Sequence, residues 1–157
     1  GQKTSKGFYN YSEGSRAPNP APENEAIYKE ISDQNNIQRR EISDQEIIDR
    51  CILALVNEGA RILEEGVAQR SGDMDIVYIN GYGFPIWRGG PMFYANQLGL
   101  SEVINKMSGF SELDEHFWKP APLLKKLADE SGAFGEAPAP EDRSELLSFK
   151  KANMGGV

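Results

Sequence analysis

The chain of 157 residues contains one cysteine and one histidine. A single cysteine excludes an internal disulfide, and the pair cannot supply the three or four ligands of a zinc site without carboxylates or a second chain. Cys51 lies in an apolar helical stretch, so we expect a buried and inert thiol. His116 is the sole imidazole base for a Ser-His-Asp triad, and its charged neighbours Glu115 and Lys119 indicate an exposed helix end. These scarcities argue against metal and nucleophilic chemistry.

Long apolar runs and clusters of positive charge are also missing. No apolar run approaches the ~20 residues of a membrane-spanning helix, and the first residues lack the charged-then-apolar order of a signal peptide. The formal net charge is −7, which disfavours a phosphate-backbone partner. Basic residues gather only in pairs that we expect to be solvated: Arg39–Arg40, Lys125–Lys126 and Lys150–Lys151. We therefore expect a soluble, intracellular protein that binds no nucleic acid and has no membrane span.

Both ends of the chain are poor in periodic apolar residues. Residues 12–22 combine proline and glycine with serine, asparagine and glutamate, and residues 132–157 combine prolines and charges with a Gly-Gly end. About 110 residues remain for a packed domain, a size that can bury a single core.

The clearest predicted element is a long helix from about Asp44 to Glu65. Ser43 followed by Glu46 has the spacing of a capping box, and Gly66 is placed to end the helix. Apolar residues recur on one side at helical spacing: Ile47, Ile48, Cys51, Leu55, Ile62 and Leu63. Ala54 and Val56 widen this stripe, so we expect burial across a broad face. Gly59 inside the helix either lowers its stability or allows a close neighbour.

Shorter helices are predicted over Glu23 to Asp33, Asp73 to Asn80, Met92 to Leu98, Ser101 to Met107 and Pro122 to Glu130. A strand over Ile76–Ile79 is an alternative to the second of these. Pro91 suits the first helical position, Gly99 and Gly132 suit helix ends, and Ser101 suits an N-cap. Helices without convincing alternating strands predict an all-α, compact helical domain.

The segment from Asn80 to Gly99 has an unusual composition. It contains five glycines and two prolines among eight aromatic or long apolar side chains. Glycine and proline set an unusual backbone path, and the bulky side chains are typical of a segment that packs against a surface or lines a pocket. The segment begins like a dinucleotide fingerprint, but Ile86 occupies the third glycine position and Pro85 interrupts it. We therefore reject a phosphate cradle here.

Two acidic pairs, Glu64–Glu65 and Asp73 with Asp75, are the remaining chemical candidates. Carboxylates support acid-base chemistry only in a desolvated cleft. We expect these four residues to be surface or capping residues.

Three segments carry a family resemblance: Gly1 to Tyr11, Ile48 to Gly66 and Asp73 to Tyr94. Together they resemble the C-terminal part of the multifunctional β-oxidation enzymes, which fuse an enoyl-CoA hydratase to an L-3-hydroxyacyl-CoA dehydrogenase. The resemblance covers about Gly1 to Phe134. The Gly-Gly-Pro-Met-Phe-Tyr run is more similar to the monomeric peroxisomal-type branch and its bacterial relatives than to the thiolase-bound α-subunits.

The resemblance implies a domain order. Residues 1–11 would end the first helical dehydrogenase domain, and residues 12–41 would form a linker that can hold a helix. Residues 42–134 would form the second helical domain, of the 3-hydroxyacyl-CoA dehydrogenase C-terminal type, and residues 135–157 an irregular or disordered tail. The second domain would brace the first and the dehydrogenase cleft. Ser5 stands where a glycine is commoner in the family, so the resemblance does not establish the local turn of the tail.

The resemblance also implies where the chemistry lies. The parent enzymes hydrate trans-2-enoyl-CoA and oxidise L-3-hydroxyacyl-CoA with NAD, and some isomerise the double bond. Their NAD-binding glycines and catalytic His-Glu pair lie in an upstream Rossmann domain, so we expect no catalytic, cofactor-binding or metal-binding residue here. His116–Pro120 is superficially similar to the family's His-Phe-Phe-Asn-Pro element, but Lys119 replaces the asparagine and no role is transferred.

The first residue lies inside a motif, which is consistent with a piece of a longer protein. The expected partners are the upstream hydratase, Rossmann and first helical domains, with acyl-CoA as the parent's substrate. A cytoplasmic, bacterial location is expected over a peroxisomal one, because the C-terminus is not of the Ser-Lys-Leu type. The alternative hypothesis is a stand-alone helical dimerisation or binding module without catalysis.

Overall fold

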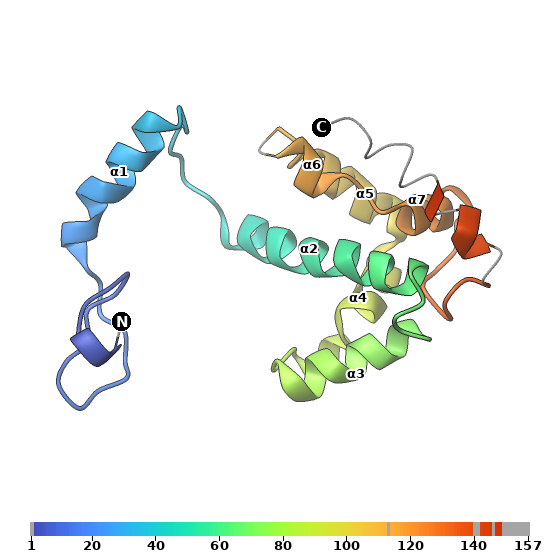
Figure 1. Cartoon of the computed structure of the whole chain (residues 1–157), viewed down its shortest axis with the longest axis horizontal. Helices are drawn as coiled ribbons and strands as arrows, with labels where there is room; N and C mark the ends of the chain where they lie inside the picture. Colours follow the sequence, from blue (N-terminus) through green and yellow to red (C-terminus); the bar gives the residue numbers. More distant parts are fainter. Residues whose placement is uncertain (1, 113, 140–141, 146, 149–157) are drawn as a thin grey trace. The chain divides into compact units, whose positions relative to one another are not determined.

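The computed structural model describes residues 2–112, 114–139, 142–145 and 147–148. The chain divides into two units, Gly1–Ile42 and Ser43–Val157. Within the described residues the regular elements are helices, accompanied by two isolated bridges, Asn10 with Asn19 and Arg70 with Glu136 (Figure 1). The predicted all-α class is therefore confirmed.

The first unit consists of short helices and turns around one bridge. Its elements are η1 (Gln2–Thr4), η2 (Pro22–Asn24) and α1 (Glu25–Gln34), so the predicted helix near residues 23–33 is present. Ile27 and Ile31 on α1 are about half exposed, and no described residue of this unit is buried. Ser5 adopts φ +55°, the left-handed region that favours glycine. Glycine would adopt this backbone without the strain that serine carries.

The second unit is organised by α2 (Asp44–Glu64). The Ser43 side chain accepts a hydrogen bond from the Glu46 N–H at 3.2 Å, as the predicted cap requires. At the other end Gly66 has φ +71°, its N–H donates to the Leu63 carbonyl, and the Val67 N–H donates to the Ile62 carbonyl. These two bonds form a Schellman motif. Both predicted ends of this helix are confirmed to within one residue.

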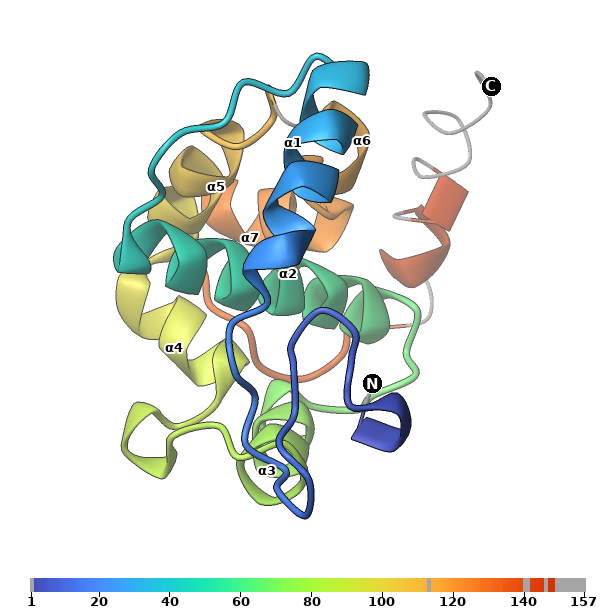
Figure 2. The ribbon, with the colours of Figure 1, turned by 90° about the vertical axis from the view of Figure 1, so that its left-hand side faces the viewer.

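The remaining helices surround α2. They are α3 (Ser71–Gly81), η3 (Ile86–Arg88), α4 (Pro91–Leu98), α5 (Leu100–Ser108), α6 (Glu115–Trp118) and α7 (Pro122–Asp129). Figures 1 and 2 show α3 and α4 along one side of α2, and α5 and α7 along the other. The strand alternative for residues 76–79 is wrong, because the whole segment is helical.

The predicted cap at Ser101 is wrong, whereas α7 ends within one residue of its predicted end and Gly132 lies just beyond it. Ser101 is not an N-cap: Gly99 precedes the first residue of α5, and the Ser101 hydroxyl donates to the Ala128 carbonyl at 3.4 Å. At the end of α7 the left-handed residue is Ser131, with φ +53°, and Gly132 is the next residue, donating its N–H to the Leu127 carbonyl. Gly132 thus lies one position after Ser131, the residue whose positive φ a glycine would adopt without strain.

Replacing Ser131 with glycine should stabilise the second unit by about 0.5–1 kcal/mol. A non-glycine residue in the left-handed region carries a strain that glycine avoids, and this gain exceeds the extra entropy of the unfolded chain. Urea unfolding measures the change. The control Ser108→Gly, at the last helical residue of α5, should lower stability instead, and equal effects of the two substitutions would contradict the assignment.

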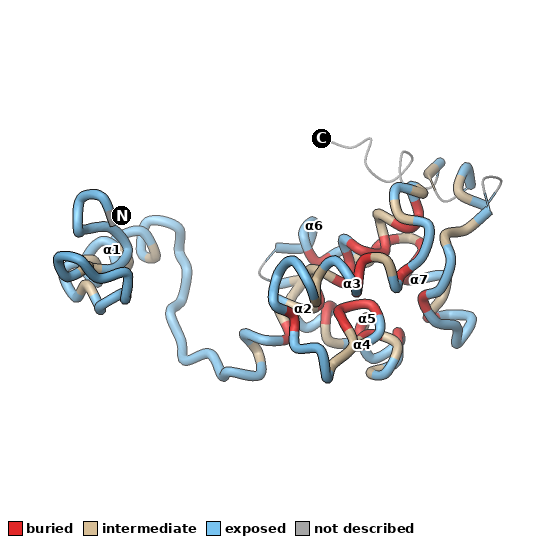
Figure 3. Tube along the Cα trace, turned by 90° about the horizontal axis from the view of Figure 1, so that it is seen from below, coloured by how far each residue is buried: buried red, intermediate tan, exposed pale blue. Residues whose placement is uncertain are grey.

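The core lies between α2, α4, α5 and α7 (Figure 3). The predicted stripe matches the side of α2 that faces it only in part: Val56 and Leu63 are buried as predicted. Ile47 and Ile48 are 49% and 45% exposed and Cys51 is exposed, so the expectation of a buried thiol is wrong. The buried side carries Asp49, Leu53, Val56, Asn57, Ala60, Leu63 and Glu64. Apolar residues occur on both sides of this helix. The sequence pattern predicted burial mainly of the outer side, because Asp49, Asn57 and Glu64 interrupt the inner one.

The segment after α7 is held against the second unit. Phe134 is buried, and its N–H and carbonyl bond to the Asn96 side chain at 2.8 and 3.0 Å. The Ser71 N–H donates to the Gly135 carbonyl, and the Ala137 N–H donates to the Gln69 carbonyl, each at 2.7 Å. Backbone pairing thus extends beyond Phe134. Lys150 and Lys151 lie outside the described residues, whereas the other two basic pairs are exposed as expected.

Candidate functional site

The outer side of α2 carries an apolar surface, here called the α2 stripe: Ile47, Ile48, Cys51, Leu55 and Ile62. Its first three members are exposed and the last two half-buried. Helical spacing places them on one side, opposite the buried side that forms the core. A helix that is apolar on two sides is typical of an element that is covered on both. The α2 stripe is therefore a candidate packing surface.

A groove between α2 and α3 continues this surface. It has a volume of about 470 Å³, and Leu55 and Ile62 of the stripe line it together with Val77, Tyr78 and Tyr82 of α3 and its end. The rings of Tyr78 and Tyr82 lie 5.2 Å apart. Apolar lining with few polar groups is typical of a site for an apolar partner.

The floor of this groove explains Gly59. A Cβ atom at this position would lie 2.5 Å from the sulfur of Met92, which is fully buried. Of the two roles expected for this glycine, the structure shows the close neighbour: α4 approaches α2 at this point. The groove therefore has a closely packed base.

The segment between α3 and α4 has a fixed path. Gly83, Gly89 and Gly90 have φ of +70°, +75° and +97°, in the region that favours glycine. Phe84 is buried, and its N–H donates to the Tyr78 carbonyl at 3.0 Å. Pro91 opens α4 as predicted. The segment between α3 and α4 thus follows the unusual backbone path that its glycines and prolines predicted.

A buried carboxylate secures the start of α4. Asp75 on α3 accepts hydrogen bonds from the N–H groups of Met92 and Phe93 at 2.8 and 3.1 Å. These groups would otherwise lack partners in the first turn of the helix. A Cβ atom on Gly90 would lie 2.4 Å from the Cβ of Asp75, so glycine is required for this approach. Asp75 is thus a cap supplied by a neighbouring helix.

The pKa of the Asp75 carboxyl gives a test of this cap. Burial raises the pKa, although the hydrogen bonds from Met92 and Phe93 act in the opposite direction. A folded-state pKa above the unfolded one means that folding takes up a proton between the two values, so stability falls as the pH rises through that window. The free energy of unfolding of the wild type, minus that of Asp75→Asn, should therefore decrease from about pH 4 upward. Urea titrations of both proteins at several pH values measure it, and an increasing difference would overturn the assignment.

The expectation that the four acidic candidates are surface or capping residues is wrong for Glu64, whereas Asp75 is a capping residue although it is buried. Glu64 is fully buried and Asp75 is 7% exposed. Glu65 is exposed, and Asp73 forms an ion pair with Arg70 at 2.9 Å. Burial of Glu64 follows from its place on the inner side of α2.

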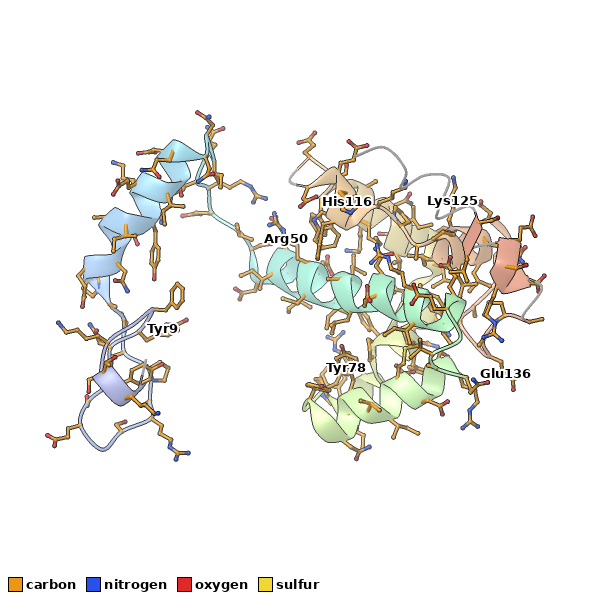
Figure 4. The ribbon with its side chains drawn as sticks, in the orientation of Figure 1. Tyr9, Arg50, Tyr78, His116, Lys125 and Glu136 are labelled. Carbon is orange, nitrogen blue, oxygen red and sulfur yellow. The ribbon has the colours of Figure 1, made fainter. Side chains whose placement is uncertain are left out.

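His116 lies on the short helix α6 and is exposed, as expected. In the view of Figure 4, His116 and Tyr78 lie on opposite sides of α2. The neighbouring Trp118 is buried, and the Lys119 carbonyl accepts a hydrogen bond from the Asn57 side chain at 3.0 Å. The Asn57 side chain also accepts from the Ala121 N–H at 2.8 Å. The contacts of this segment attach it to α2.

The described residues do not fit a dinucleotide. No strand leads into a glycine turn and a helix, and the glycine segment follows α3 and enters a 3₁₀ turn at Ile86. Within the same residues no group of three histidine, cysteine, aspartate or glutamate side chains is placed to hold a metal ion. None of the described helices combines the length and the hydropathy that a bilayer span requires.

Comparison with known proteins gives the relationship of this helical domain. No protein-family model matches the chain. The peroxisomal bifunctional enzyme of Danio rerio is 41% identical over 152 residues, which are 95% of this chain and 21% of that protein. The human protein of the same name is 39% identical over 133 residues, or 83% and 18%. The fatty acid oxidation complex subunit alpha of Acinetobacter baumannii (strain SDF) is 33% identical over 135 residues, or 86% and 19%.

The described residues are thus all-α, and the chain has relatives among much longer enzymes. It is homologous to one part of the multifunctional fatty-acid β-oxidation enzymes and fits their C-terminal part, as the sequence resemblance predicted. The chain spans about a fifth of the length of the curated relatives it matches.

Proposed function

We propose that this chain is the C-terminal helical part of a fatty-acid β-oxidation enzyme and that its role is structural. The parent would hydrate trans-2-enoyl-CoA and oxidise L-3-hydroxyacyl-CoA with NAD. In this proposal, residues 1–11 end a first helical domain, residues 12–41 link it to the second, and residues 42–134 brace the dehydrogenase part. The division of the chain after Ile42 supports a boundary there.

The α2 stripe is the observation that carries the structural role. The helix is apolar on its outer side as well as its inner side, and the groove beside α3 extends the outer surface. Exposed apolar surface of this kind is typical of a covered interface. Relatives about five times as long supply further polypeptide that could cover it.

The chemistry is assigned to the upstream part. The described residues do not fit NAD, so the Rossmann domain of the longer polypeptide would bind the cofactor and hold the catalytic groups. We infer a cytoplasmic location for a bacterial chain, which the bacterial relatives support. Relatives named peroxisomal or glyoxysomal support the same metabolic role in organelles.

The experiment introduces Ile48→Gln into the proposed parent enzyme, which contains this chain and the upstream domains and is here called the longer polypeptide. Ile48 is chosen because it lies in the α2 stripe and is 45% exposed. We expect a lower thermal midpoint and a loss of dehydrogenase activity on heating, with hydratase activity less affected. The isolated 157 residues should keep their own midpoint, since the substitution touches no core residue. Lys126→Gln on α7, also exposed, is the control and should change neither protein.

The alternative, a stand-alone dimerisation module, makes the opposite prediction. It requires that the chain alone form a defined dimer and that Ile48→Gln dissociate this dimer. Sedimentation of the 157 residues with and without the substitution distinguishes the two. If the longer polypeptide with and without residues 43–157 were equally stable and active, the bracing role would be wrong.

A further inference from the structure

We infer that Arg88 and Trp87 form an anchor that binds an aspartate or glutamate side chain of the upstream part of the same polypeptide. This inference rests on the proposed function and names the chemistry of one contact within it. Arg88 lies in η3, and its guanidinium carbon is 4.5 Å from the centre of the Trp87 ring and 5.2 Å from that of Tyr94. Two aromatic rings thus hold the cation in place.

The donors of this arginine are not used by the described residues. Arg50, Arg61 and Arg70 each form an ion pair with a carboxylate three or four residues away. Within the described part of the chain, Arg88 has its ring contacts but no hydrogen bond or ion pair to a carboxylate. Stacking occupies the faces of a guanidinium and leaves the N–H groups at its edge, which match a carboxylate in bidentate geometry.

The backbone presents this arginine in a fixed position. Gly83, Gly89 and Gly90 have positive φ, and buried Phe84 holds the segment on α3. The Asp75 cap fixes the other end at α4. A preformed segment loses little conformational entropy when it binds, so the contact is stabilising even for one ion pair.

The surroundings favour a protein segment over a phosphate ligand. Ile86 and Trp87 beside the arginine are 76% and 75% exposed, and Tyr82 is 75% exposed. Exposed aromatic side chains beside an arginine are typical of a protein interface, where tryptophan and arginine are common anchors. A phosphate site would call for a second cation, and Lys106, the lysine of α5, is already bonded to Asp49 at 2.8 Å.

The first test compares Arg88→Gln and Arg88→Lys in the longer polypeptide and in the isolated 157 residues. We expect Arg88→Gln to lower the thermal midpoint of the longer polypeptide by about 3 °C and to leave the isolated chain within about 1 °C. Arg88→Lys should recover part of the loss, since lysine keeps the charge but not the bidentate geometry. The control Lys125→Gln, an exposed residue of α7 with the same charge change, should have no effect. Equal effects of Arg88→Gln in both proteins would show a local structural role and overturn the inference.

The second test identifies the occupant with a photo-crosslinking residue at Ile86. We expect one crosslink within a single molecule, to an upstream peptide that contains aspartate or glutamate close to the crosslinked atom. A crosslink between two molecules, or to a peptide without an acidic residue, would overturn the inference. If deletion of residues 43–157 destabilises the upstream part but Arg88→Gln does not, the anchor is wrong and the bracing role stands. If deletion has no effect, the proposed function itself is wrong.

Discussion

Replacing Gly90 with alanine should destabilise the second unit by about 3–5 kcal/mol, a large share of the stability of a small domain. Gly90 has φ +97° and ψ 168°, a region that is essentially restricted to glycine and costs other residues about 1–3 kcal/mol. The new Cβ would also lie 2.4 Å from the Cβ of Asp75. Relief of that contact moves α3 away from α4 and breaks the hydrogen bonds to Met92 and Phe93, which adds about 1–3 kcal/mol.

Two other glycines separate these causes. Gly99 has φ +89° but nothing within 4 Å of its Cβ position, so Gly99→Ala should show the backbone strain alone, about 1–2 kcal/mol. Gly72 lies in α3 with ordinary φ and open space, and Gly72→Ala should be neutral or slightly stabilising. Urea unfolding of the three variants measures the order. Equal costs for Gly90→Ala and Gly99→Ala would show that the Asp75 contact is unimportant.

Helix ends were predictable from the sequence because they depend on neighbouring residues. Ser43 with Glu46, Gly66, and Pro91 each act through backbone groups within a few positions, and the structure shows each in its expected place. Ser131 shows the limit of such reasoning. Gly132 follows directly, so composition suggested the right turn but the wrong residue for the positive φ.

The inner side of α2 could not be predicted from the sequence in the same way. Both sides of this helix are apolar, and the buried side includes Asp49, Asn57 and Glu64. Polar residues are placed inside only where distant groups satisfy them, as Lys106 does for Asp49 across 57 positions of sequence. Such partners are not visible in a local pattern. The Asp75 cap and the Arg88 contacts also join different elements. For the same reason they could be identified only in the three-dimensional structure.

Replacing Asn57 with alanine should destabilise the second unit by about 2–4 kcal/mol. Asn57 is 2% exposed. Its side chain donates a hydrogen bond to the Lys119 carbonyl and accepts one from the N–H of Ala121, a residue that is 1% exposed. The Lys119 carbonyl keeps a second donor, Arg61 at 3.3 Å, whereas the Ala121 N–H loses its partner. A buried donor left without a partner costs about 1–3 kcal/mol, and the cavity adds to this. Asn105→Ala, at an exposed position of α5, should stay within about 0.5 kcal/mol.

Tryptophan fluorescence can show how Asn57→Ala affects the segment around Trp118. Trp118 is 7% exposed and packs against Phe110 and Phe117, with ring centres 5.0 and 5.1 Å apart, whereas Trp87 is 75% exposed. In a Trp87→Phe background, the emission therefore reports on Trp118 alone. Asn57→Ala should shift this emission to longer wavelength before global unfolding, because the segment that carries Trp118 is held to α2 through Asn57. An unchanged emission up to the global transition would mean that ring packing, and not the Asn57 side chain, holds α6 in place.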